Sequence, residues 1–268
     1  MAEPPFRLQR GTAPLLVSMP HVGTAIPPAI AARMRPIASR LDDTDWHLEP
    51  LHDFLAELGA SVLVPMASRY VVDLNRDPDG RSLYPGQDTT PLCPTDTFDR
   101  EPLYAPGAAP DAAEIEQRVA TWWSPYHAAL ADELARIRAA HGVALLWDAH
   151  SIRSVVPRFF DGTLPDLNIG TARGAACAPG LGDALLDVAR THPSFSAVLD
   201  GRFVGGHITR TYGRPAAGIH AVQLELVQRT YMEEAPPWRF DPARAAAVRP
   251  VLRAMIETAL GHVRGLAG

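Results

Sequence analysis

The sequence predicts an α/β protein in which helices pack on a sheet that is at least partly parallel. Short apolar runs, such as residues 60–65, alternate with stretches in which apolar residues recur every three or four positions. The runs at 143–147 and 219–227 are apolar at almost every position, which is typical of strands covered on both faces. The chain has 268 residues, 47% of them hydrophobic, enough for one large core. Because no internal repeat or linker is visible, we expect residues 1–268 to form a single domain.

The composition argues against nucleic-acid and membrane partners. The 25 basic residues are all arginine and are scattered, and 30 acidic residues outnumber them, which gives a net charge of −5. No apolar run is long enough to span a bilayer, and residues 1–9 lack the apolar segment of a signal peptide. Cys93 and Cys177 do not have the spacing of a metal-binding pair. We therefore expect a cytoplasmic protein that acts on a small molecule.

The first part of the chain contains three candidate strands and one candidate helix. The strands are residues 14–19, 60–65 and 70–76. Apolar residues spaced by three and four predict a helix that begins near Asp45 and stops at Gly59. One of the acids just before this helix is expected to cap it, although three acids in four positions exceed what a cap requires.

The second part of the chain begins with a long loop at residues 77–110, rich in proline, glycine, aspartate and threonine. Loops of this length usually bind or cover a ligand, so we expect it to lie over the sheet edge. Residues 112–141 predict a long helix with a candidate break at Pro125. The remaining predicted elements are a strand at 166–170, a helix at 181–189, an extended segment at 195–199, a loop at 205–210, a strand at 219–227 and a helix at 240–263.

Polar side chains stand where the apolar strands end. His21 and His150 each follow an apolar run directly, and Glu225 lies inside one, where an unpaired carboxylate is rarely tolerated. In open α/β sheets, ligands bind beyond the carboxyl ends of the strands. We therefore expect these side chains to converge there with the acids at 42–45.

Two histidines and one carboxylate are the ligand set of many hydrolytic zinc sites, whose fourth position stays open for water. A second carboxylate must then accept a proton from that water, and Glu225 is the free candidate. Each residue also has a structural alternative. His21 can lie in an exposed loop, an acid at 42–45 can cap a helix, and Glu225 can pair with an arginine. The spacing is not the local His-Glu-x-x-His pattern, so the residues alone leave these alternatives open.

Seven motifs of the chain resemble those of the N-formylglutamate amidohydrolase (deformylase) family. They occur in the family's order and span about residues 14–232, most of the chain. Each motif is weak alone, but the ordered set is fairly specific. The motifs are residues 18–23 (SMPHVG), 43–47 (DTDWH), 68–76 (SRYVVDLNR), 147–151 (WDAHS), 166–170 (DLNIG), 205–210 (GGHITR) and 223–226 (QLEL).

The resemblance implies a three-layer α/β/α sandwich with a mixed, mostly parallel sheet, similar to zinc carboxypeptidases and aspartoacylases. It also implies one zinc ion per chain, held by His21, His150 and an acid that enters the first helix. We expect this acid to be Asp45, with Asp43 as the alternative. Glu225 would be the general base and then the general acid. One departure is that carboxypeptidases place their first two ligands within a short turn, whereas 24 residues separate His21 from Asp45.

The activity that the resemblance implies is hydrolysis of N-formyl-L-glutamate to formate and L-glutamate, the last step of one histidine-degradation route. Asn75 and Arg76 resemble the carboxypeptidase pair that holds a substrate carboxylate. Three further residues are expected to bind substrate: His207, Arg210 and Arg153. Asp148 is expected to orient a ligand rather than to bind the metal.

Two rival functions remain at this point. One is hydrolysis of a different N-acyl amino acid or of a peptide, as in a small zinc carboxypeptidase. The other is a small-molecule binding protein on the same scaffold, in which the acids and histidines serve structure. Metal content and a panel of substrates distinguish these two functions from the hydrolysis of N-formylglutamate.

Overall fold

The computed structural model describes residues 4–81, 86 and 88–266. In this part of the chain, seven strands form one sheet in the order β1-β3-β2-β4-β7-β5-β6. The four strands β3, β2, β4 and β7 are mutually parallel. β1 runs antiparallel to β3, β5 runs antiparallel to β7, and β6 is parallel to β5. The strands are β1 (Phe6–Gln9), β2 (Leu15–Ser18), β3 (Ser61–Pro65), β4 (Ala144–Ile152), β5 (Leu167–Gly170), β6 (Ala197–Leu199) and β7 (Ile219–Val227).

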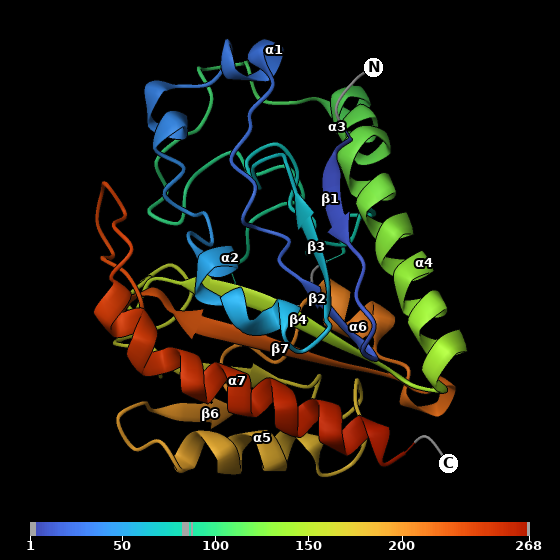
Figure 1. Cartoon of the computed structure of the whole chain (residues 1–268). Helices are drawn as coiled ribbons and strands as arrows, with labels where there is room; N and C mark the ends of the chain where they lie inside the picture. The colour runs from blue at the N-terminus through green and yellow to red at the C-terminus, as the bar shows by residue number, and fades with distance from the viewer. Residues whose placement is uncertain (1–3, 82–85, 87, 267–268) are drawn as a thin grey trace.

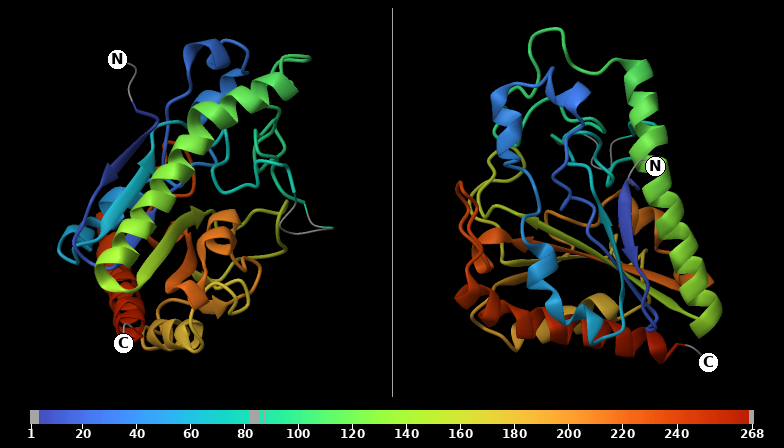
Figure 2. Two further views of the ribbon diagram at one scale, coloured as in Figure 1. Left: turned by 90° about the vertical axis from the view of Figure 1, so that its right-hand side faces the viewer. Right: turned by 45° about the horizontal axis from the view of Figure 1, so that its top comes forward.

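Helices cover both faces of the sheet (Figures 1 and 2). One face packs against α4 (Ser124–His141) and α6 (His207–Tyr212), and the other against α5 (Leu181–Arg190) and α7 (Pro242–Arg264). Along β4, Leu145 and Trp147 join the core beneath α5 and α7, while Leu146 joins the core beneath α4. Because alternate side chains enter opposite cores, β4 is apolar at successive positions. The predicted three-layer α/β/α sandwich with a mixed, mostly parallel sheet is confirmed.

The predicted long helix at 112–141 is continuous but changes its pitch. It consists of α3 (Ala112–Arg118), a π-helical turn at Val119–Trp123 and α4. This π-helical turn precedes Pro125, which lacks a backbone N–H and so cannot donate to the carbonyl one turn earlier. The N–H of Ser124 instead donates to the carbonyl of Val119, five residues earlier.

The helix predicted from Asp45 is shorter and begins later than expected. It consists of α2 (Leu48–Leu51) and a 3₁₀ turn at Asp53–Ala56. His47, at φ 62°, occupies the cap position in the left-handed region, so none of the preceding acids caps the helix. The acids at 42–45 are buried in the segment that leads into α2. Helix capping therefore does not explain why these acids are buried.

Two further predictions are wrong. Residues 70–76 are buried but form turns rather than a strand, because turn bonds such as Arg76 N–H to Asp73 carbonyl replace a ladder with neighbouring strands. Residues 205–210 are not wholly a loop, since α6 begins at His207. β1, an edge strand in which Phe6 and Leu8 alternate with the more exposed Arg7 and Gln9, is not among the predicted strands. A short α1 (Pro28–Ala31) completes the α-helices of the described ranges, none of which has the length and apolarity to cross a membrane.

Candidate metal centre

His21, Asp45 and His150 meet at the carboxyl end of the parallel strands. The Nδ1 atoms of the two histidines lie 3.1 Å apart. Asp45 Oδ2 lies 3.6 Å from Nδ1 of His21 and 3.3 Å from Nδ1 of His150. All three side chains are buried. In the part of the chain that the structure describes, this is the one group of three or more such residues with the spacing of metal ligands.

The sheet and one backbone bond bring the three residues together. His150 lies near the end of β4, and His21 lies just past the end of β2, the strand that pairs with β4. The N–H of Asp45 donates to the carbonyl of His21 at 3.1 Å, which ties the acidic segment to the turn after β2. Asp43 does not join the group, because its Oδ2 accepts from the N–H of Phe98 at 3.0 Å. Of the two acids considered, Asp45 is therefore the one beside both histidines.

The arrangement fits a tetrahedral metal ion. Zinc bonds of about 2.0–2.2 Å place neighbouring ligand atoms about 3.3–3.6 Å apart, close to the separations of 3.1, 3.3 and 3.6 Å found here. Asp45 Oδ2 is buried and has no hydrogen-bond partner among the described residues. Burial disfavours a charged ring, yet the carboxylates of Asp148 and Asp45 raise the pKa of His150 well above its usual value. The group therefore attracts positive charge and offers unpaired ligand atoms to a cation.

A carboxylate outside the group fixes the orientation of His21. The Nε2 of His21 lies 2.7 Å from Asp73 Oδ1, and Arg69 donates to the other oxygen of Asp73 at 2.7 Å. Burial alone would raise the pKa of Asp73, but the charges of Arg76, His21 and Arg69 hold it well below its usual value. An ionised carboxylate only accepts, so Nε2 of His21 carries the proton. Its Nδ1 is left with a lone pair that faces Asp45 and His150.

The second histidine has a similar support. Nε2 of His150 lies 3.2 Å from Asp148 Oδ1 and 3.0 Å from Asn75 Nδ2. Asn75 Oδ1 accepts from the N–H of Ile208 at 2.8 Å, which turns the amide nitrogen toward His150. The amide nitrogen of Asn75 donates to Nε2, the carboxylate of Asp148 lies beside it without accepting a hydrogen bond at Oδ1 from any described residue, and Nδ1 of His150 again faces the metal position.

Glu225 lies on β7 in register with His150 on β4. Burial raises the pKa of Glu225 to about 8. Among the described residues, no arginine forms an ion pair with Glu225, and its one side-chain partner is Gln223, whose Nε2 donates to Oε2 at 3.4 Å. A structural pairing with arginine therefore does not explain why this carboxylate is buried.

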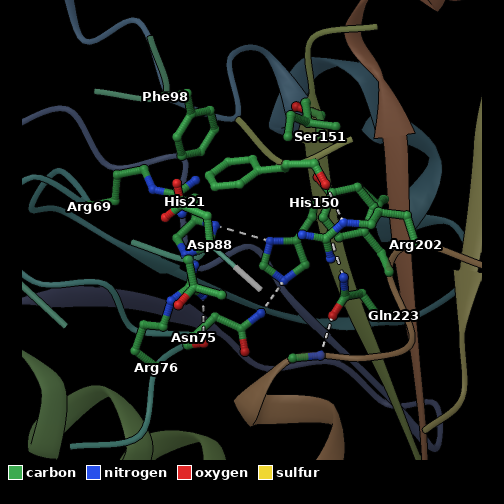
Figure 3. A pocket seen from close by; sticks show the side chains of 16 residues that line it. His21, Arg69, Asn75, Arg76, Asp88, Phe98, His150, Ser151, Arg202 and Gln223 are labelled. Atoms are coloured by element: carbon green, nitrogen blue, oxygen red, sulfur yellow. Dashed lines mark hydrogen bonds between the residues drawn. The ribbon is translucent and has the colours of Figure 1, made fainter. Parts of the chain in front are cut away.

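A pocket opens onto these residues. It is lined by His21, His150 and Glu225, and Figure 3 shows the side chains that surround it. The lining combines cationic and apolar groups: the arginines are Arg69, Arg76 and Arg202, and the aromatic residues are Phe98, Phe159 and Phe203. Such a lining suits a small molecule that carries negative charge and a short apolar stem.

The residues predicted to bind substrate divide into two groups. Asn75 and Arg76 line the pocket. His207, Arg210 and Arg153 are not among its lining residues. The ring of His207 packs against those of Trp123 and His127. Arg210 is exposed and donates to the carbonyl of Gly205, and Arg153 forms a bidentate contact with Asp99.

Sequence reasoning missed four residues that the structure places in or beside the pocket. Arg69 and Asp73 stand in the motif at 68–76, which could have singled them out. Gln223 belongs to the motif at 223–226 and accepts from the N–H of Gly206 at 2.6 Å. Arg202 lies in an irregular segment with no periodic pattern, so nothing in the sequence marked it.

Comparison with known proteins decides the family. A profile of the N-formylglutamate amidohydrolase family matches residues 13–232, most of the chain. The chain belongs to this family. Like its relatives, this family member is a hydrolase that acts on a linear amide.

Two curated relatives of the family member are N-formylglutamate deformylases. The protein from Pseudomonas aeruginosa is 52% identical over 256 residues, 96% of each chain. The protein from Pseudomonas putida is 48% identical over 251 residues, 94% of each chain. Among solved structures, an N-formylglutamate amidohydrolase from Ralstonia eutropha JMP134 superposes with a TM-score of 0.80 at 23% identity, over 97% of this chain and 98% of that one. A gene product of Agrobacterium tumefaciens gives a TM-score of 0.71 at 20% identity, over 97% and 96%. These two structures share the fold.

Proposed function

We propose that the protein is a zinc-dependent N-formylglutamate deformylase, which hydrolyses N-formyl-L-glutamate to formate and L-glutamate. Two observations support the substrate: the curated relatives carry this name at 52% and 48% identity, and the pocket holds three arginines beside the candidate metal ligands. The single observation that carries the chemistry is the convergence of His21, Asp45 and His150 next to Glu225.

The candidate ligands are Nδ1 of His21, Nδ1 of His150 and a carboxylate oxygen of Asp45. A zinc ion held there supplies Lewis-acid polarisation of the amide carbonyl and lowers the pKa of water toward neutrality. Asp73 keeps the imidazole of His21 in the tautomer that leaves Nδ1 unprotonated, and the carboxylate of Asp148 lies 3.2 Å from Nε2 of His150. One zinc ion per chain is expected.

Glu225 acts first as the general base and then as the general acid of the reaction. Its carboxylate takes a proton from the water that attacks the formyl carbon, and the carboxylic acid then gives a proton to the leaving amide nitrogen. A pKa raised by burial suits both steps, since the carboxylate is basic enough to accept a proton near neutral pH. The buried position also keeps bulk water from competing for that proton.

The arginines of the pocket bind the two carboxylates of the substrate. Arg69 already donates to Asp73 and to the carbonyl of Asp43. We assign the substrate carboxylates to Arg76 and Arg202, which line the pocket together with Asn75. Phe98 and Phe159 form the apolar wall against which the two methylene groups of glutamate pack.

The test is formate release from N-formyl-L-glutamate by the purified protein, with and without a metal chelator and after zinc is restored. We expect turnover that the chelator abolishes and zinc restores. A panel of N-acetylglutamate, N-formyl-leucine and short peptides covers the rival hydrolases. Hydrolysis of those compounds without hydrolysis of N-formylglutamate would refute the substrate, and full activity in the chelator would refute the metal. Glu225→Gln is expected to bind zinc normally and to lose turnover.

A further inference from the structure

Residues 73–76 carry the contacts that support both histidines. Asp73 binds Nε2 of His21, Asn75 contacts Nε2 of His150, and Arg76 lines the pocket. This segment belongs to no strand, so no ladder of sheet hydrogen bonds fixes its backbone. Turn bonds and the bond from the N–H of Asp73 to the carbonyl of Leu92 hold part of it, and side chains from another part of the chain bind its carbonyls.

Two ring N–H groups of one helix hold the backbone on either side of Asn75. Nε2 of His127 lies 2.8 Å from the carbonyl of Leu74, and Nε1 of Trp123 donates to the carbonyl of Arg76 at 3.0 Å. A carbonyl only accepts, so His127 carries its proton on Nε2. Nδ1 of His127 then accepts from the hydroxyl of Tyr212 at 2.9 Å.

The two rings are themselves fixed relative to each other. They stack with centroids 3.7 Å apart and planes inclined by 19°. Trp123 is the last residue of the π-helical turn, and His127 lies four residues further along α4. π-helical turns are rare and occur frequently at functional sites. The ring of His207, from α6, packs against both the Trp123 and the His127 rings.

We propose that the stacked pair Trp123–His127 is a positioning device for the active site, which fixes residues 74–76 and thereby directs Asn75 toward His150 and Arg76 toward the substrate. Neither ring is a catalytic residue, since neither lines the pocket. The role of Arg76 in this inference rests on the proposed function, whereas the role of Asn75 rests on the contact with His150 alone.

The first experiment removes the indole N–H and measures substrate binding. Trp123→Phe keeps an aromatic ring in the stack, and Trp122→Phe, at an equally half-buried position of the same turn, is the matched control. We expect Trp123→Phe to raise KM for N-formylglutamate about fivefold relative to the control, which corresponds to about 1 kcal/mol for one neutral hydrogen bond. A KM within about 1.5-fold of the control would overturn the proposal for Trp123.

A second replacement covers the case in which Trp123→Phe does not fold. Incorporation of 3-benzothienylalanine at position 123 keeps the shape of the bicyclic ring and replaces only the N–H by sulfur. The same rise in KM with an unchanged melting temperature is expected. An unchanged KM in this protein would show that the hydrogen bond to Arg76 has no positioning role.

The second experiment measures zinc binding and does not depend on catalytic activity. His127→Phe removes the bond to Leu74, whereas Tyr212→Phe keeps that bond, removes the hydroxyl contacts with Nδ1 and the carbonyl of His127, and is the control. We expect His127→Phe to weaken zinc binding about fivefold, measured by competition with a chromophoric chelator, and Tyr212→Phe to leave it unchanged. Equal zinc affinity in both variants would overturn the proposal for His127. If the unaltered protein binds zinc but does not hydrolyse N-formylglutamate, the proposed function fails while this zinc measurement still decides the inference.

Discussion

The Nδ1 atoms of His21 and His150 lie 3.1 Å apart, although 129 residues separate the two histidines in the chain. Their opposite nitrogens face carboxylates, Asp73 for His21 and Asp148 for His150. Both Nδ1 atoms therefore face the same small volume beside Asp45. A cation bound there relieves the repulsion between them. Substitutions of these three residues should therefore lower the metal content of the protein.

Asp45→Asn should lose zinc, whereas Asp43→Asn should retain it. Asparagine keeps the shape of the side chain but removes the charge that faces both histidines. Asp43 is equally buried but bonds to the backbone of Phe98. Zinc per chain, measured by atomic absorption after dialysis, distinguishes the two variants. Retention of zinc by Asp45→Asn together with loss by Asp43→Asn would reverse the assignment.

Asp73→Asn should weaken zinc binding without removing a ligand. Loss of a carboxylate that orients a metal-binding histidine typically costs about 10–100-fold in affinity. Asp77→Asn is the matched control, because Asp77 is nearby in sequence but pairs with Arg81 at the surface. Competition with a chelator measures both affinities. Equal affinities in the two variants would mean that Asp73 does not support His21.

Arg202→Leu should impair binding of substrates with two carboxylates and leave others less affected. The guanidinium lines the pocket, and a desolvated charge pair with a substrate carboxylate is worth several kcal/mol. We expect KM for N-formylglutamate to rise by at least about tenfold, with a smaller change for N-formylnorvaline. Arg210→Leu is the control, since Arg210 is exposed outside the pocket lining. A larger effect of Arg210→Leu would restore the assignment made from the sequence motif.

The stability of the fold should decrease as the pH falls below about 6.5. Burial lowers the pKa of His52 to about 4, so the unfolded chain binds this proton at a higher pH than the folded chain does. Between pH 6.5 and 5, this one group should lower the free energy of unfolding by about 2 kcal/mol. Urea unfolding at the two pH values measures the loss. His52→Gln should reduce the pH dependence by that amount, and His192→Gln, at a half-buried surface position, should reduce it by less.

The layers of the fold and the strands that end at the site follow from local patterns in the sequence. Apolar runs and helical periodicity are local patterns. They located β2, β3 and β7 to within a residue, whereas β4 continues to Ile152, beyond the apolar run at 143–147. The same patterns placed His21 and His150 at carboxyl ends of strands. Parallel pairing then brings such positions to one edge, because neighbouring strands run in the same direction. The family motifs supplied Asp45 and Glu225.

Which side chains meet depends on contacts between distant parts of the chain, and these appear only in the folded structure. Asp43 and Asp45 are equivalent in the sequence, and the left-handed turn at His47 with the bond from Asp45 to His21 separates them. Arg202 comes from an irregular segment and enters the pocket, whereas Arg210, in a family motif, does not. The physical reason is that a local pattern fixes the path of the backbone, while the direction of a side chain in a turn depends on hydrogen bonds to residues far away in the chain.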